Sequence, residues 1–131
     1  MKCSRIRPAG LAMALIIVCS SAVLLLAEVA DAADGDLSGA YAMTGTSLRP
    51  NSQTYEGECI LALVGEVYNV TCINSGSGDK YVGKGIRRGD QFSLYLGEYL
   101  IVYRIEENGR LTGSWAHSRS DDYGKENLKR K

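Results

Sequence analysis

Two cysteines placed symmetrically about a turn signal constrain this chain more than any other feature. Cys59 and Cys72 lie thirteen residues apart, and Gly65-Glu66 occupies the midpoint between them. A two-residue loop with glycine at its first central position is typical of a type II′ hairpin turn. Counting outward from this turn sets Cys59 opposite Cys72, at a non-hydrogen-bonded pair whose Cα atoms lie about 4.5 Å apart. The spacing therefore predicts an antiparallel hairpin closed by a disulfide.

The first 32 residues are typical of a signal peptide. Three basic residues precede the apolar run 11–27, and Ala30 and Ala32 supply the small-x-small pattern that a signal peptidase recognises. We expect cleavage after residue 32, which leaves 33–131 as a single β-barrel domain; the alternative is an uncleaved transmembrane anchor. Export to the periplasm or out of the cell favours oxidised thiols. A metal site is the other use of two cysteines, but the chain has one histidine, so we expect no metal or cofactor.

The remainder of the chain alternates at period two, which is the pattern of β-strands. Glycine and tyrosine are abundant, with 15 and 8 residues, and this composition is typical of strands joined by tight turns. We expect about eight strands of about seven residues each, at 38–46, 54–64, 66–73, 80–86, 91–97, 98–105, 110–116 and 125–129. Such a series closes most economically as an all-β, antiparallel, up-and-down barrel, with the last strand beside the first.

Two further hairpins indicate which side chains point inward. Gly97-Glu98 repeats the first turn signal. At Asn108-Gly109, a two-residue loop would place the apolar residues of the flanking strands on opposite faces, whereas a three-residue loop over 107–109 pairs Ile105 with Leu111. Because the buried face sets the register, we expect the three-residue loop, with its glycine left-handed. The interior set is then Tyr55, Leu61, Leu63, Tyr68, Val70, Phe92, Leu94, Leu96, Tyr99, Ile101, Tyr103, Leu111 and Trp115.

Inward glycines beside inward aromatics suit a small closed sheet, where large and small side chains alternate. A barrel of eight strands is just wide enough to be filled by side chains or to hold one small ligand. Because the expected strands are short and the aromatics bulky, we expect a filled interior. The alternative is an aromatic-lined pocket, and its candidate lining is Tyr68, Phe92, Tyr99, Tyr103 and Trp115.

An apolar patch is expected on the outer face of two neighbouring strands. It consists of Tyr95, Leu100 and Val102, with Arg104 at one edge. Adjacent exposed apolar residues suggest a contact surface, for a protein partner or for a second copy in a homodimer. The alternative is scattered surface residues of no functional meaning.

The charge balance argues against nucleic acid as a partner. The whole chain has 15 basic and 15 acidic residues, and loss of the leader would leave 12 and 13. A nucleic-acid-binding domain needs a concentrated basic face. We do not expect an enzyme either, because the chain has no Ser-His-Asp set and no insert long enough to build a cleft around paired carboxylates. Nor do we expect membrane contact after signal cleavage.

Five short motifs follow one another through the second half of the chain: Tyr81-x-Gly83-x-Gly85-Ile86, Gly89-Asp90-x-Phe92-Ser93, Val102-Tyr103-Arg104-Ile105, Gly109-x-Leu111-x-Gly113-x-Trp115 and Gly124-x-Glu126-x-Leu128. In this series the chain resembles small exported bacterial β-barrel proteins, some of which are labelled fibronectin-binding. Its shape is also similar to the calycin group of lipocalin-like, avidin-like and protease-inhibitor barrels. The resemblance implies a protein or extracellular-matrix partner and brings no catalytic or ligand-binding residue with it.

Three functions are compatible with these features. The first, and the expected one, is an exported, non-enzymatic binding module with a filled barrel that acts through its outer surface on a protein or matrix partner. The second is a small-molecule carrier with an aromatic-lined interior. The third is an envelope scaffold or an inhibitor of a secreted protease.

Overall fold

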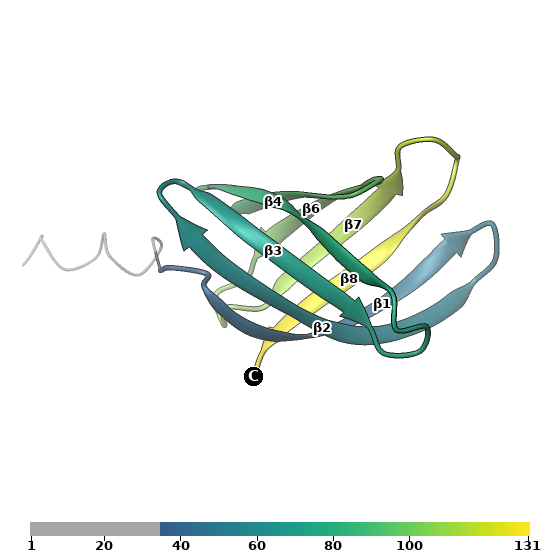
Figure 1. Ribbon diagram of the computed structural model, residues 1–131, viewed down its shortest axis with the longest axis horizontal. Helices are drawn as coiled ribbons and strands as arrows, with labels where there is room; N and C mark the ends of the chain where they lie inside the picture. Colours follow the sequence, from purple (N-terminus) through teal and green to yellow (C-terminus); the bar gives the residue numbers. More distant parts are fainter. Residues whose placement is uncertain (1–34) are drawn as a thin grey trace, which may run out of the picture. The chain divides into compact units, whose positions relative to one another are not determined.

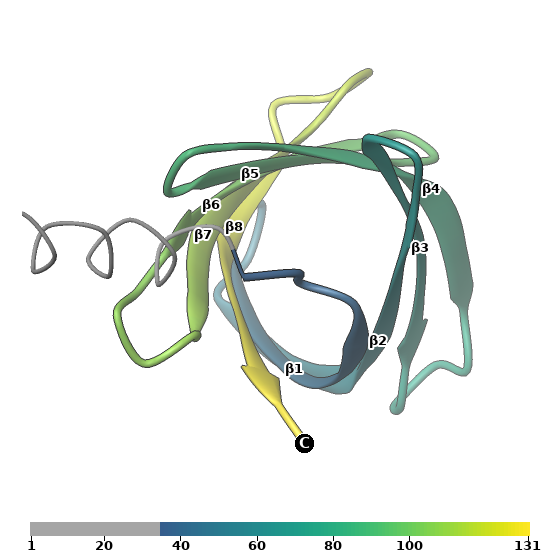
Figure 2. The same cartoon turned by 90° about the vertical axis from the view of Figure 1, so that its left-hand side faces the viewer.

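The computed structural model describes residues 35–131, and the expected signal peptide lies outside the described residues. Eight antiparallel strands form one closed barrel in sequence order, as predicted (Figure 1). The strands are β1 (Gly39–Arg49), β2 (Gln53–Val64), β3 (Val67–Asn74), β4 (Lys80–Arg88), β5 (Gln91–Leu96), β6 (Tyr99–Ile105), β7 (Leu111–His117) and β8 (Tyr123–Arg130). β1 pairs with both β2 and β8, which closes the ring (Figure 2). Within 35–131, no helix is long and apolar enough to cross a membrane.

The β2–β3 hairpin has the register that its turn predicts. Gly65 has a φ of +66°, and the flanking residues Val64 and Val67 pair directly. Five positions further out, Cys59 pairs with Cys72, and the two form a disulfide with their Cα atoms 4.1 Å apart. Both cysteines are buried. The turn therefore sets the register, and the register brings the two thiols together.

The predicted three-residue loop between β6 and β7 is also confirmed. Ile105 pairs with Leu111, and Gly109 has a φ of +78°. This register continues to the pair formed by Ile101 and Trp115, so the apolar series of both strands share the inner face. A two-residue loop would have turned one series outward, which is why burial selects the longer loop.

Almost the whole predicted interior set is found inside. Every member except Leu63 belongs to the buried core or packs against it, and Tyr41, Met43 and Leu128 join it. Leu63 is 41% exposed, so its prediction as an interior residue is wrong. The reason is that β2 extends past the start of β1, whose pairing with β2 begins at Leu61, so Leu63 pairs with Tyr68 of β3 but has no β1 partner on its other side.

The chain segment 35–38, here called the plug, runs across one end of the barrel (Figure 2). Leu37 is 5% exposed, and its N–H donates to the Tyr68 hydroxyl at 3.1 Å. The carbonyl of the same residue accepts a hydrogen bond from the Tyr41 hydroxyl at 2.8 Å. Arg130 of β8 donates to two carbonyls of the plug, at 2.7 and 3.1 Å. Apolar burial and satisfied backbone groups therefore hold the plug in place.

Candidate functional site

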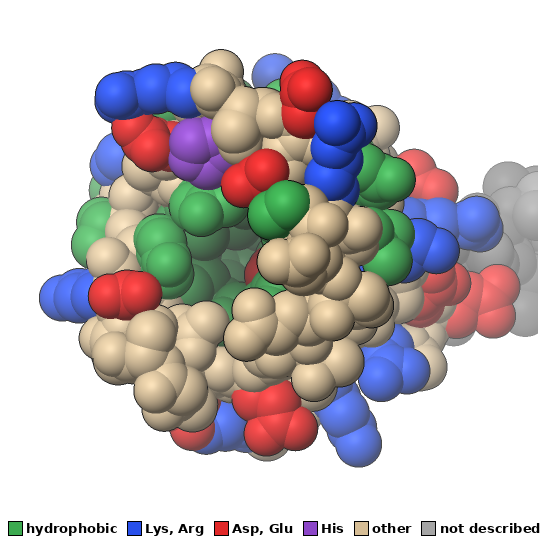
Figure 3. Space-filling model, turned by 90° about the vertical axis from the view of Figure 1, so that its right-hand side faces the viewer, with side chains coloured by type: hydrophobic (Ala, Val, Ile, Leu, Met, Phe, Trp, Pro, Cys, Tyr) green, Lys and Arg blue, Asp and Glu red, His purple; other side chains and the backbone are tan. Residues whose placement is uncertain are grey.

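The end of the barrel opposite the plug is open. A cavity of about 250 Å³ extends from this opening into the barrel. The links β1–β2, β3–β4, β5–β6 and β7–β8 surround this opening, here called the mouth. Figure 3 shows a hollow whose visible walls are mostly hydrophobic, with acidic, basic and histidine side chains around it. The aromatic residues of its lining are Tyr55, Tyr81, Tyr99 and Trp115, and the acidic ones are Asp122 and Glu126.

The expectation of a filled interior therefore holds only for the half next to the plug. β1 has 11 residues and ends at Arg49, three residues beyond the expected strand 38–46, so it extends the barrel wall toward the mouth. β2 has 12 residues and agrees with the expected strand 54–64 to within one residue. Along this wall the aromatic rings pack against one another. The centroids of Tyr81 and Tyr99 lie 5.7 Å apart at 89°, and those of Tyr99 and Trp115 lie 5.5 Å apart at 82°. Such edge-to-face contacts stabilise the rings as a lining of the cavity.

The five residues predicted as a ligand lining are divided between the two halves. Tyr99 and Trp115 line the cavity. Tyr68, Phe92 and Tyr103 are buried in the filled half, where Tyr68 and Phe92 pack edge-to-face with centroids 5.3 Å apart. The structure thus brings two of the five to the open site and uses the other three as core.

A buried carboxylate, Glu126 of β8, lies in the cavity wall and is 6% exposed. Its partners on the neighbouring strands are two glycines, Gly45 and Gly113. A Cβ at Gly45 would lie 2.0 Å from Cζ of Tyr55, and one at Gly113 would lie 2.7 Å from Cδ1 of Tyr103. The two glycines therefore leave the space that the two tyrosine rings occupy beside the carboxylate.

Both tyrosines donate hydrogen bonds to this carboxylate. The Tyr55 hydroxyl donates to Oε2 of Glu126 at 2.7 Å, and the Tyr103 hydroxyl donates to Oε1. Burial raises the pKa of Glu126, while the hydrogen bonds from Tyr103 and Tyr55 oppose the rise. Burial and the nearby carboxylate raise the pKa of both tyrosines, so the hydroxyls keep their protons and remain donors.

Glu126 should make the stability of the protein depend on pH. Because its pKa is raised in the folded state, its stabilising contribution is complete below the ordinary glutamate pKa and is lost as pH rises through the raised value. The facing titratable groups, Tyr55 and Tyr103, keep their protons throughout this range. We expect Glu126→Gln to gain stability relative to the native protein between pH 4 and pH 7, measured by urea unfolding at each pH. A relative loss over that interval would contradict the raised pKa.

The indole N–H of Trp115 is the other unusual polar group of the site. It is buried and makes no hydrogen bond of good geometry among residues 35–131, although its interaction with the Tyr55 hydroxyl acts to lower the pKa of that tyrosine. A buried donor without an acceptor costs free energy, and such groups are often found where a ligand or water completes the site. Trp115 is also the only tryptophan in the chain, so its fluorescence reports on this cavity alone.

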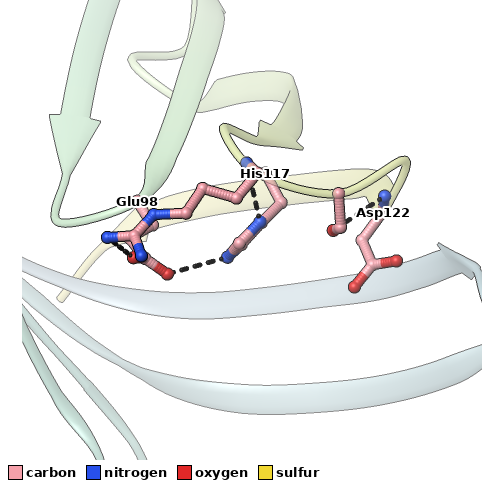
Figure 4. Close-up of polar contacts among 5 residues, drawn as sticks. Glu98, His117 and Asp122 are labelled. Atoms are coloured by element: carbon pink, nitrogen blue, oxygen red, sulfur yellow. Dashed lines mark hydrogen bonds and ion pairs between the residues drawn. The ribbon is translucent and has the colours of Figure 1, made fainter.

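A polar network holds the mouth in shape on the side of β7 (Figure 4). Nε2 of His117 lies 3.1 Å from Oε2 of Glu98, and Arg119 forms an ion pair with the same carboxylate. The backbone N–H of Arg119 donates to Nδ1 of His117 at 3.1 Å, so Nε2 carries the proton and donates to Glu98. These contacts join the β7–β8 link to the β5–β6 turn at the mouth. The His117 ring also packs against the ring of Tyr99, with the two centroids 5.0 Å apart.

The predicted outer patch lies on β5 and β6, away from the cavity. Tyr95 and Leu100 pair directly and are 52% and 51% exposed, and Val102 is 41% exposed. Arg104 pairs with Gln91 at the other end of these strands. The residues lie where the register predicts, and their role as a contact surface stays a prediction.

Sequence reasoning missed six residues of the cavity wall: Met43, Ser47, Asn74, Tyr81, Asp122 and Glu126. The alternation of Gly124, Glu126 and Leu128 at period two is the signal that could have identified an inward-facing carboxylate. No group of three or more His, Cys, Asp or Glu within 35–131 is arranged to hold a metal ion.

The sequence matches no protein-family model, and no curated protein is similar to it. The geometry of the barrel therefore carries the functional argument.

Proposed function

We propose that this protein is an exported, non-enzymatic carrier that binds one small molecule in the open half of its barrel, in the periplasm or outside the cell. The observation that carries the proposal is the cavity of about 250 Å³, which lies between the mouth and the filled half of the barrel. Ligand sites are typically concave and apolar, with a few polar groups that fix orientation. An aromatic wall containing one buried carboxylate and one buried indole N–H fits that description.

The outer patch supports a protein partner less strongly. Tyr95, Leu100 and Val102 are no more exposed than apolar residues elsewhere on the barrel, since Ile60 and Val82 are 58% and 60% exposed. Exposure alone therefore does not distinguish the patch, because single exposed apolar residues are common on protein surfaces. Binding to a protein or matrix partner, which the sequence resemblance implies, is therefore the second candidate function, and the experiment below distinguishes it from the carrier function.

Native mass spectrometry of the mature protein, purified from its own envelope without denaturation, tests the carrier function. We expect a chain with an intact disulfide that carries one small molecule. Ser47→Phe should abolish this adduct, because Ser47 lines the cavity and a ring there fills it. Leu48→Phe, on the exposed neighbouring residue, should keep it.

A different spectrum would contradict the proposal. A bare chain, with no change in Trp115 fluorescence on adding small apolar molecules, would exclude a carrier and direct the search to the outer patch. Retention of the adduct by Ser47→Phe would place the ligand outside the cavity.

A further inference from the structure

The cavity has an asymmetric charge. In the part of the chain that the structure describes, its lining contains two acidic residues, Asp122 and Glu126, and neither Lys nor Arg. At the mouth, the negative charges of Asp122, Glu98 and Asp79 all act to raise the pKa of Tyr99, in addition to the effect of burial. Arg119 offsets one of these charges through its ion pair with Glu98. A cleft that carries charges of one sign in largely apolar walls concentrates their electric field, so an acidic cleft attracts cations.

Among residues 35–131, Glu126 has no ion-pair partner of the kind that a buried carboxylate usually has. Its two hydrogen-bond partners, Tyr55 and Tyr103, are neutral hydroxyls. Burying a carboxylate costs free energy, and a cation that shares the site offsets much of that cost. The cavity beside Glu126 gives a charged ligand group access to it.

The walls around this carboxylate are the kind that recognise organic cations. Tyr81, Tyr99 and Trp115 form a continuous series of edge-to-face rings, and Tyr55 lies beside Glu126. Aromatic cages of this type bind ammonium groups through the electron-rich faces of their rings. An anionic ligand would meet only repulsion from Asp122 and Glu126.

The size of the cavity limits the ligand further. An apolar cavity of about 150 Å³ is enough to hold benzene. The volume here, about 250 Å³, therefore accommodates one ring with a short side chain. Given the proposed carrier function, on which this step rests, we infer that the cavity selects a small organic cation: a ring-sized apolar body carrying an amine that faces Glu126.

Three probes of similar shape and different charge test the inference. Phenethylamine is a cation, 2-phenylethanol is neutral and phenylacetate is an anion at pH 7. Titration of each against the mature, oxidised protein is followed by Trp115 fluorescence, since this residue is the only tryptophan. We expect the amine to bind about tenfold or more tightly than the alcohol, and phenylacetate to bind most weakly.

Two variants assign the selectivity to one residue. Glu126→Gln keeps the size of the side chain and removes its charge, so it should reduce the affinity for the amine at least about tenfold and leave the alcohol unchanged. Asp121→Asn is the control, because Asp121 is an exposed acid that pairs with Arg49 at 3.7 Å and does not line the cavity. This variant should bind all three probes as the native protein does.

The outcomes separate the two proposals. Equal binding of alcohol and amine, or tighter binding of phenylacetate, overturns the cation inference and leaves the carrier function intact. A uniform loss of all probes in Glu126→Gln also overturns it, because it shows a structural role. If this variant does not fold, the order of the affinities of the native protein for the three probes decides whether the cation inference holds. No fluorescence response to any probe overturns the inference, and the bound mass found by native mass spectrometry then decides the carrier function.

Discussion

Replacing both Cys59 and Cys72 by alanine is expected to lower the free energy of unfolding by about 3 kcal/mol. The disulfide joins residues 13 positions apart, so it closes a short loop in the unfolded chain and limits the conformations of that chain. In a domain of this size the loss corresponds to a fall in Tm of about 12–24 °C. Urea and thermal unfolding of the native and double-alanine proteins measure both quantities.

The native protein treated with a reductant is the matched control for this variant. It should unfold at the same urea concentration as the double-alanine protein, since both lack the crosslink. Both should also show a steeper dependence on urea than the oxidised protein, because a chain without the crosslink exposes more surface when it unfolds. An unchanged midpoint in the double variant would show that the crosslink contributes nothing to stability.

Gly83→Ala is expected to lower the free energy of unfolding by about 3 kcal/mol for a different reason. Gly83 lies on β4 and pairs with Leu96 of β5. A Cβ at this position would lie 1.7 Å from the carbonyl oxygen of Tyr95. That atom belongs to the backbone and cannot rotate away, so the pairing of β4 with β5 must shift. Chemical unfolding of the purified variant measures the loss.

Gly76→Ala provides the control for the loss of a glycine as such. Gly76 lies in the β3–β4 link, and the nearest atom to an added Cβ is the side-chain oxygen of Asn74, at 3.4 Å. This variant should stay within about 0.5 kcal/mol of the native protein. Similar losses in both variants would mean that the close approach of β4 and β5 is not what requires glycine at position 83.

The hairpins could be predicted from the sequence because each depends on a local signal. Gly65-Glu66 determines the pairing of β2 with β3, and Gly109 that of β6 with β7, through a turn of two or three residues. Burial of one face then selects between neighbouring registers. The disulfide and the barrel follow from these turns, and most of the core follows from the alternation of the strands.

The cavity could not be predicted in the same way, because it depends on contacts between the two ends of the chain. β1 pairs with β8, and its register shifts between Ser47 and Arg49. No turn connects these two strands, so no local signal places Glu126 beside Gly45. The extension of β1 to Arg49, beyond its expected end at residue 46, likewise follows from its pairing with β8 in the closed sheet.

The plug has a consequence for how the protein can be attached to something else. Residue 35 begins the plug, and Lys131 follows β8, where its N–H donates to the carbonyl of Ala40 at 3.0 Å. The two ends of the described chain therefore leave the barrel on the same side, opposite the mouth (Figure 1). A tether or fusion partner joined at either end leaves the mouth facing away, so an immobilised protein keeps its cavity open to solvent.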